Sequence, residues 1–429
     1  MRLGGRLAAA IEVLEDMQRR RRPASDALKD WGLSHRFAGS GDRAAIGNIV
    51  YDALRRRRSA AWLFGEETPR AEAFGALLLE WNRSAQAINA ALDGDRFAPP
   101  PLSDQELRAV EANDPALAPD AVRADLPDWC APLFEAAFGE EWVVEAAALS
   151  ARPPLDLRVN SLLSGRNAVL AELADCGPEA TAIAPQGVRI APIAGDGRHP
   201  NVQAEPAFQK GWFEVQDEGS QIVAHLAGAL PGQRVLDYCA GGGGKTLALA
   251  ADMGNQGEIF AHDSDKARLA PIFDRLRRAS VTNTTVISRT AELEPLAGKM
   301  DLVFIDAPCT GAGTWRRKPD AKWRLSLRQM EVRRREQAAI LDEASRFVRP
   351  GGRLVYVTCS VFEEENGVQL RGFVERMPGF RAVDHVALWE ASLTAAPSLA
   401  RIGKADGVRL TPARSGTDGF FFAAMERAA

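Results

Sequence analysis

Strand-like and helix-like segments alternate from Gly211 to the C-terminus, and this alternation constrains the fold more than any other feature of the chain. Short apolar runs alternate with longer segments whose apolar residues recur at helical spacing. Such an order predicts an α/β fold with a largely parallel sheet and helices on both of its faces. Five runs are predicted as strands: Arg234–Tyr238, Glu258–Ala261, Thr285–Ser288, Asp301–Ile305 and Arg353–Val357.

Helices are expected between these strands, notably over Asp265–Ala279 and Ser326–Val348. Gly351-Gly352 is expected to end the second helix, because glycine readily takes the left-handed conformation found at helix ends. A last strand is predicted within Asp418–Met425, antiparallel and at or near the edge of the sheet.

The residues before Gly211 differ in composition and in the spacing of their apolar positions. Residues 1–148 are rich in Ala, Leu and Glu, and their apolar residues recur at helical spacing, which predicts an all-helical domain. Residues 149–210 place a helix between two strand-like runs, which predicts a small α/β subdomain. Residues 211–429 would then form a third domain, and 429 residues are enough for two or three cores.

Composition narrows the class of protein. Hydrophobic residues make up 46% and charged residues 26% of the chain, as in ordinary globular proteins. Five unevenly spaced cysteines do not form a disulfide framework, which indicates a reducing compartment. No apolar stretch is long enough to span a bilayer, and the Arg-rich N-terminus lacks a signal core. We therefore expect a cytoplasmic protein with no membrane association and no metal site.

Two cysteines close strand-like runs. Cys309 ends Asp301-Leu-Val-Phe-Ile-Asp-Ala-Pro-Cys, and Cys359 ends Arg353-Leu-Val-Tyr-Val-Thr-Cys. The carboxyl ends of neighbouring parallel strands meet over one crevice, where ligands bind. A single free cysteine often simply packs in a core. Two at strand ends favour a functional pair, in which one thiol attacks a substrate and the other assists a later step.

A glycine-rich loop follows the first strand, in Asp237-Tyr-Cys-Ala-Gly-Gly-Gly-Gly-Lys-Thr246. A phosphate-binding loop would need glycine at position 239, which is cysteine, so that motif is excluded. Asp263 lies 263 − 241 = 22 positions beyond Gly241, where an acidic residue meets the ribose hydroxyls of a nucleoside ligand. S-adenosylmethionine and NAD both fit this pattern, and Asp237 can serve the sulfonium nucleoside, which has no phosphates.

Arginine runs occur at Arg19–Arg22, Arg55–Arg58 and Arg333–Arg335. The planar guanidinium group suits phosphate and stacks on bases. Each run alone is more typical of a solvated helix face, and the net charge of −4 does not by itself indicate nucleic acid. Trp315–Lys318 differs, because it follows Cys309 closely and is expected to border the crevice.

Together these segments resemble the RNA 5-methylcytosine methyltransferases of the Sun family, in particular the RsmB-like branch. The glycine motif of that family, Asp-x-Cys-Ala-Ala-Pro-Gly-Gly-Lys-Thr, is matched by Asp237–Thr246 with Gly241 and Gly242 in place of Ala-Pro. Its Asp-Ala-Pro-Cys-Thr-Gly-x-Gly motif is matched by Asp306–Gly313. Further matches are Arg158–Asn160, Gln216–Ser220, Arg316–Asp320, Thr358–Asn366 and Asp418–Phe421.

The resemblance implies a Rossmann-like, S-adenosylmethionine-dependent methyltransferase domain that methylates C5 of cytosine in RNA through a covalent cysteine–C6 adduct. It implies that Cys359 is the nucleophile and that Cys309 assists release. Asp306 would face the base and border the cofactor methyl group. Lys245 would lower a thiol pKa or orient Asp306, unless it is a surface lysine that opens a helix. The implied cofactor-binding residues are Asp237, Cys239, Ala240, Gly241, Gly242, Gly243, Gly244, Lys245, Asp263, Thr290 and Asp306.

The sequence departs from the family pattern at three positions. Loss of the proline at Gly242 predicts a more flexible cofactor loop. Thr290 stands where the family usually offers an aspartate to the adenine, and the proline that follows Thr-Cys-Ser is replaced near Glu363.

The helical residues 1–148 resemble the NusB-like RNA-binding extension of the same branch. The expected substrate is ribosomal RNA, with transfer RNA as an alternative, and a monomer is expected. A DNA cytosine methyltransferase is an open alternative, although the Glu-Asn-Val motif of those enzymes is absent. A catalytically idle RNA-binding or ribosome-assembly factor is a second, and an NAD-dependent oxidoreductase a distant third because no hydride-transfer set is evident.

Overall fold

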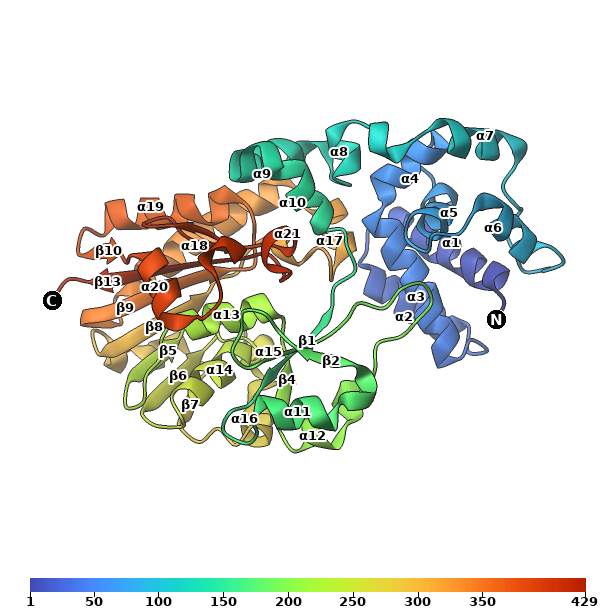
Figure 1. Cartoon of the computed structure of the whole chain (residues 1–429). Coiled ribbons are helices and arrows are strands. Elements are labelled where there is room, and N and C mark those ends of the chain that lie inside the picture. The colour runs from blue at the N-terminus through green and yellow to red at the C-terminus, as the bar shows by residue number, and fades with distance from the viewer. The chain divides into compact units, whose positions relative to one another are not determined.

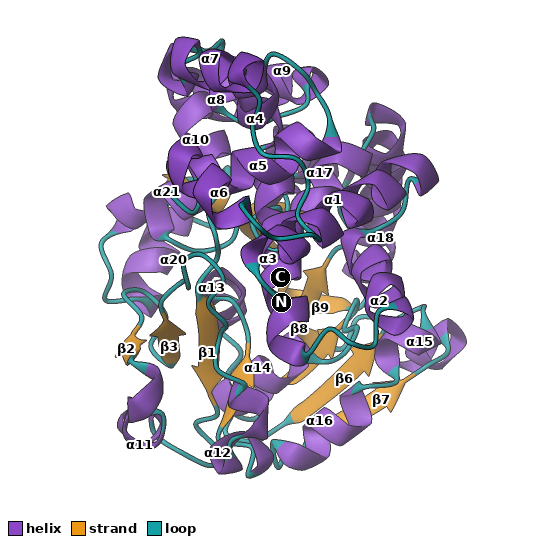
Figure 2. Cartoon of the chain, turned by 90° about the vertical axis from the view of Figure 1, so that its right-hand side faces the viewer, coloured by secondary structure: helices purple, strands orange, loops and turns teal.

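The computed structural model describes all residues, 1–429, and divides into two compact units (Figure 1). The helical unit comprises residues 1–153, 192–199 and 315–325, and the sheet unit comprises residues 154–191, 200–314 and 326–429. Every strand lies in the sheet unit, and Figure 2 distinguishes the strands from the helices by colour. None of the helices combines the length and the apolar character that crossing a membrane requires.

The helical unit is built around α1, α3 and α5, whose buried faces supply Leu7, Ile46, Ile49 and Phe74 to one core. Short polar side chains start several of its helices, as Thr68 does by accepting a hydrogen bond from the Ala71 amide. Its helices are α1 (Leu3–Arg20), α2 (Ala24–Ser34), α3 (Ser40–Arg55), α4 (Arg57–Phe64), α5 (Pro69–Leu79), α6 (Ala85–Leu92), α7 (Asp104–Ala112), α8 (Asp120–Arg123), α9 (Ala131–Phe138), α10 (Trp142–Ala148) and α17 (Pro319–Arg324).

The segment Trp315–Leu325 belongs to the helical unit, although the sequence predicted it to be part of the methyltransferase domain. Trp315 is 1% exposed, and its ring centroid lies 6.0 Å from that of Phe134. Arg316 is also buried. Both side chains are therefore core residues of the helical unit rather than an exposed border of the crevice, because the chain enters that unit immediately after Thr314.

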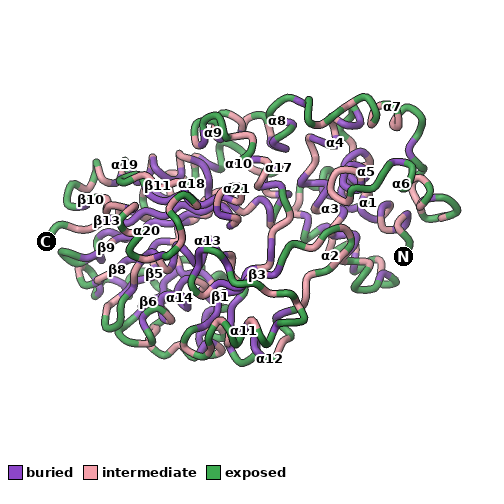
Figure 3. The backbone as a smooth tube through the Cα atoms, viewed as in Figure 1, coloured by how far each residue is buried: buried purple, intermediate pink, exposed green.

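The sheet unit contains two sheets. The smaller is antiparallel with the strand order β2-β3-β1-β4, and it groups with the larger sheet rather than forming a separate compact unit. The larger has the order β11-β12-β13-β9-β8-β5-β6-β7, and β10 also pairs with β13. In it β5 to β9 are parallel, and β9 pairs with antiparallel β13. Figure 3 shows buried backbone along these central strands.

The five predicted strands are confirmed as β5 to β9. The strands are β1 (Leu155–Val159), β2 (Pro178–Ala180), β3 (Gly187–Ile190), β4 (Phe213–Val215), β5 (Arg234–Asp237), β6 (Glu258–His262), β7 (Thr284–Ile287), β8 (Met300–Asp306), β9 (Val348–Thr358), β10 (Phe380–Ala382), β11 (Arg401–Gly403), β12 (Gly407–Leu410) and β13 (Phe420–Arg427). The helices are α11 (Arg166–Glu172), α12 (Pro206–Gln209), α13 (Glu218–Leu226), α14 (Gly244–Asp252), α15 (Lys266–Leu269), α16 (Ile272–Arg278), α18 (Leu327–Ser345), α19 (Gly367–Arg376), α20 (His385–Ser392) and α21 (Pro412–Ser415).

Two expectations about these elements are wrong in detail, and a third is confirmed. The predicted helix Asp265–Ala279 is divided into α15 and α16 around Pro271. Gly351-Gly352 does not end a helix: α18 ends at Ser345, and both glycines lie within β9, where Gly351 has φ +70°. β13 is antiparallel and near the edge as predicted, because only β12 and β11 lie beyond it on that side of the sheet.

Candidate active site

Functional side chains gather where the parallel strands of the large sheet end. β5 ends at Asp237, β6 leads into Asp263, β8 ends at Asp306 and β9 leads into Cys359. The four strands are neighbours in the order β9-β8-β5-β6, so their carboxyl ends share one edge of the sheet. The residues predicted to line a crevice therefore come together at the edge of the sheet where ligands bind in folds of this kind.

Cys309 and Cys359 meet at this edge. Their Sγ atoms lie 3.4 Å apart, and both cysteines are free and partly exposed. The sulfur–sulfur contact and burial raise the pKa of the Cys309 thiol well above its ordinary value. Cys309 therefore retains its proton at neutral pH and can donate it to a neighbouring group.

Glu365 fixes the loop that carries Cys309, and sequence reasoning missed it. The side chain of Glu365 is fully buried, and it accepts hydrogen bonds from the Thr310 amide at 2.9 Å and the Thr310 hydroxyl at 2.5 Å. Gln337 of α18 donates to the same carboxylate at 3.0 Å. The only signal in the sequence was the acidic run after Cys359, and periodicity alone does not tell which acid turns inward.

Gly313 and Gly419 allow motifs from distant parts of the sequence to lie next to one another in the structure. A Cβ on Gly313 would lie 2.0 Å from the Gly419 carbonyl oxygen, so the two backbones pass closer than any side chain allows. The Gly313 amide donates to the Cys359 carbonyl at 2.9 Å. Asp217 in turn accepts from the Asp418 amide at 3.0 Å. The motifs around positions 217, 313, 359 and 418 thus form one support for the cysteine pair.

Lys245 and Asp306 form an ion pair of 2.9 Å. Lys245 is 7% exposed, so the alternative of a surface lysine is wrong. The Lys245 ammonium also lies 5.3 Å from the ring centroid of Phe420. The lysine reaches Asp306 because α14 starts directly at the glycine loop, beside the end of β8.

The glycine loop takes conformations that require glycine. Gly241 has φ +50° and Gly243 has φ +83°. A Cβ on Gly243 would lie 2.5 Å from the Ile272 side chain. The Gly241 amide donates to Asp263 at 3.0 Å, so the acid predicted 22 positions downstream does meet the loop.

Arg275 occupies the space beside Gly242, where the family carries a proline. A Cβ on Gly242 would lie 3.3 Å from Arg275 Nη1, and this nitrogen donates to the Gly242 carbonyl at 2.7 Å. Glu214 holds Arg275 from the other side at 3.1 Å. Instead of the free loop that the lost proline suggested, the structure shows a loop held by a guanidinium group.

The remaining predicted cofactor residues lie around this loop. Asp237 is fully buried, accepts a hydrogen bond from Thr246 at 2.6 Å, and has its pKa raised to about 7 by burial. The Ala240 amide donates to the His262 carbonyl at 2.8 Å, and the neighbouring Cys239 is partly buried. Gln216 Nε2 donates to the Gly244 carbonyl at 3.4 Å. Thr290 is exposed at the start of a 3-10 turn after β7.

This sheet, glycine loop and acidic residue at the second strand define a Rossmann-like, S-adenosylmethionine-dependent methyltransferase domain. Residues 226–426 match the family model for the 16S rRNA methyltransferase RsmB/F, and residues 126–193 match the RsmF/B-like ferredoxin-like domain. The chain belongs to this RsmB/F methyltransferase family.

Relatives in this family are ribosomal RNA small subunit methyltransferase B of Sodalis glossinidius and its probable counterpart in Synechocystis sp. The first is 33% identical over 74% of this chain and 70% of its own length. The second is 33% identical over 60% of this chain and 58% of its own length. The chain thus spans less than two thirds of some of the relatives that it matches.

Solved structures share the fold. The structure of PH0851 superimposes with a TM-score of 0.74 over all of both chains at 25% identity. NSun6 from Pyrococcus horikoshii, solved with SFG, has a TM-score of 0.60 at 22% identity and covers 71% of this chain and 99% of its own.

S-adenosylmethionine is the cofactor of this class, and the loop fits a nucleoside ligand. Gly241 and Gly243 leave the loop backbone without side chains where a ligand approaches. Each Asp263 oxygen accepts one backbone amide, from Gly241 or Asp265, which leaves lone pairs for ribose hydroxyls. Asp237 Oδ1 has no hydrogen-bond partner within the chain. No group of His, Cys, Asp and Glu side chains is arranged to hold a metal ion.

Proposed function

We propose that this chain transfers a methyl group from S-adenosylmethionine to C5 of a cytosine in RNA. The observation that carries the proposal is the 3.4 Å contact between the Cys309 and Cys359 sulfurs at the strand ends. The names of the relatives, ribosomal RNA small subunit methyltransferases, support ribosomal RNA as the substrate.

Cytosine needs covalent activation, because its C5 is too weak a nucleophile to take a methyl group unaided. Cys359, as thiolate, adds to C6 and converts the ring to an enamine whose C5 attacks the methyl group. A base then removes the C5 proton, and elimination breaks the bond between sulfur and C6. The cofactor supplies the electrophilic methyl group when it is bound.

The two thiols have different roles in this proposal. Cys309 Sγ lies 3.4 Å from Cys359 Sγ, so Cys309 is close enough to an adduct on Cys359 to assist its release. Glu365 fixes the loop beside it, so Cys309 is held against the nucleophile. The choice of Cys359 as the nucleophile rests on the resemblance to the Sun family.

Asp306 and Lys245 act as a unit in this proposal. The lysine ammonium orients the Asp306 carboxylate through the 2.9 Å ion pair, so that the carboxylate can accept a hydrogen bond from the amino group of cytosine. Asp263 and the loop of Gly241 to Gly244 bind the nucleoside part of the cofactor. The helical unit supplies RNA affinity.

The two cysteines should fail differently. Cys359→Ala removes the nucleophile, so we expect no activity and no covalent RNA complex. Cys309→Ala leaves attack and methyl transfer intact and impairs release, so an adduct that survives denaturing electrophoresis should accumulate with target RNA.

The reverse pattern, with an adduct only in Cys359→Ala, would assign the nucleophile to Cys309, as in DNA cytosine methyltransferases. Transfer of labelled methyl groups to DNA and not to RNA would replace the proposed substrate. Full activity of both variants would show that the thiols are structural and would refute the proposal.

A further inference from the structure

An open cavity of about 740 Å³ lies within the helical unit. The N-terminal half of α1, the end of α2 and the loop after α6 line it. α1 contributes the small residues Gly5, Ala8 and Ala9, which leave room above the helix backbone. Neither the glycine loop nor the cysteine pair takes part in this cavity.

The cavity is lined by aromatic rings that the fold does not bury. Phe37 is 72% and Phe97 64% exposed, and they are the two most exposed phenylalanines of the chain. Trp31 and His35 stack with ring centroids 4.3 Å apart and planes inclined by 11°. Large apolar side chains gathered at a solvent-exposed cavity indicate a binding surface.

Cations and hydrogen-bond acceptors stand beside these rings. Arg2 and Arg96 line the cavity and form no ion pair, and the Arg96 guanidinium lies 4.6 Å from the Phe97 ring centroid. Glu12 accepts a hydrogen bond from the Trp31 indole through one oxygen, at 2.9 Å. Asp95 holds the loop, because its Oδ1 accepts a hydrogen bond from the Phe97 amide at 3.1 Å.

We propose that this cavity binds unpaired nucleotides of RNA. Bases stack on aromatic rings, an exocyclic amino group can donate to the second oxygen of Glu12, and their phosphates suit unpaired arginines. An apolar protein segment would use the rings but would leave Glu12 and the two guanidinium groups without partners. The choice of RNA as the nucleic acid rests on the proposed function, whereas the site itself is a second contact apart from the cysteine pair.

The test compares Phe37→Ala/Phe97→Ala with Phe273→Ala, a matched control that removes a 56% exposed ring from α16 of the sheet unit. Both are made in the Cys359→Ala background, so that no adduct contributes to binding. The probes are a fluorescent single-stranded oligoribonucleotide and the duplex of the same sequence. Phe37 and Phe97 are exposed, so their loss should leave the fold intact, which circular dichroism checks.

The double variant should bind the single strand at least about tenfold more weakly than the control, since each stacked base contributes about 1–3 kcal/mol. Its salt dependence should stay unchanged. Arg96→Ala should instead reduce the salt slope by about 0.7, as expected for one lost phosphate contact. Duplex affinity should not change in the double variant.

Equal single-strand affinity of the double variant and the control would overturn the proposal and leave an apolar protein segment as the occupant. An equal loss for single strand and duplex would overturn base recognition. Failure of the proposed function has a separate readout, because absence of an RNA adduct in Cys309→Ala concerns the cysteines and not this cavity.

Discussion

Three acidic residues end neighbouring strands, and their surroundings separate their roles. Asp237 is buried with a raised pKa, Asp306 is paired with Lys245, and Asp263 accepts two backbone amides. Of the three, only Asp263 accepts a hydrogen bond from an amide of the glycine loop, that of Gly241. At the scale of single residues it is therefore the ribose-binding candidate.

Asp263→Ala should weaken S-adenosylmethionine binding by about 1–3 kcal/mol, the cost of leaving hydroxyl and amide partners unpaired. Titration calorimetry measures the affinity. Asp265→Ala is the matched control, because Asp265 only caps α15 and is exposed. Unchanged affinity in Asp263→Ala would show that another residue holds the ribose.

At the scale of elements, α16 and the glycine loop act together. Arg275 of α16 bonds the Gly242 carbonyl and fills the place of the proline that the family carries there. The sequence showed the missing proline, but it could not show that a residue 33 positions away compensates for it. Substitutions at Gly242 and Arg275 can test this compensation directly.

Arg275→Ala should lower cofactor affinity by about 1–2 kcal/mol, because the loop loses a charged hydrogen-bond donor. Adding Gly242→Pro to this variant should restore most of the affinity, because the ring fits the space that the guanidinium leaves. Gly242→Pro alone should bind the cofactor more weakly, since ring and guanidinium compete for that space. A double variant no better than Arg275→Ala would refute the compensation.

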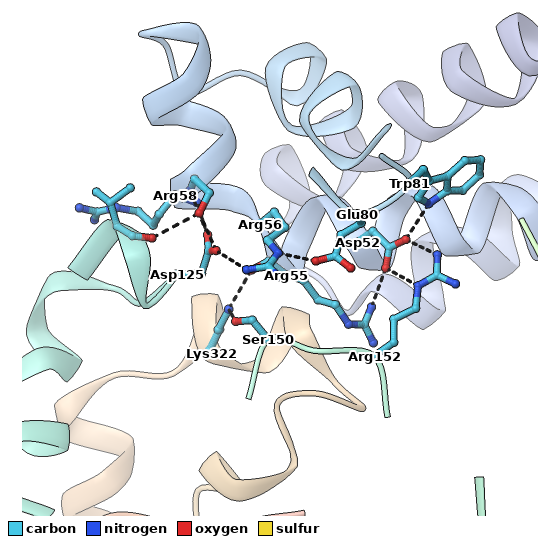
Figure 4. Close-up of polar contacts among 12 residues, drawn as sticks. Asp52, Arg55, Arg56, Arg58, Glu80, Trp81, Asp125, Ser150, Arg152 and Lys322 are labelled. Atoms are coloured by element: carbon cyan, nitrogen blue, oxygen red, sulfur yellow. Dashed lines mark hydrogen bonds and ion pairs between the residues drawn. The ribbon is translucent and has the colours of Figure 1, made fainter. Parts of the chain in front are cut away.

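At the scale of the whole molecule, the chain crosses between its two units more often than its sequence suggested. α17 is anchored in the helical unit by Lys322, whose ammonium donates to Ser150 at 3.0 Å and to the Arg55 carbonyl at 3.3 Å (Figure 4). Residues 1–148 therefore cover α17 and Trp315, and deleting them would expose buried residues that lie a few positions after Cys309.

Burial lowers the pKa of Lys322 to about 7. Between pH 7 and 10.5 the unfolded chain binds the proton that the folded chain has lost, so the contribution of Lys322 to stability rises with pH. Lys322→Met should remove a slope of up to about 1.4 kcal/mol per pH unit from the free energy of unfolding of the helical unit. Chemical denaturation at several pH values measures this slope.

Lys318→Met is the control, at an exposed lysine of the same segment, and it should retain the slope. Loss of the slope in both variants would contradict the assignment of the pH dependence to Lys322.

The sequence by itself determined the five parallel strands, the glycine loop and the meeting of Cys309 with Cys359. These features follow from local periodicity and from the rule that parallel strands end at one edge. Only the tertiary structure decided that Gly351-Gly352 lie inside a strand, that Lys245 is buried against Asp306, and that Glu365 turns inward. It also decided which unit holds Trp315–Leu325 and which aromatic rings stay exposed around the cavity. The physical reason is that burial and pairing depend on residues far away in the chain, which local patterns do not encode.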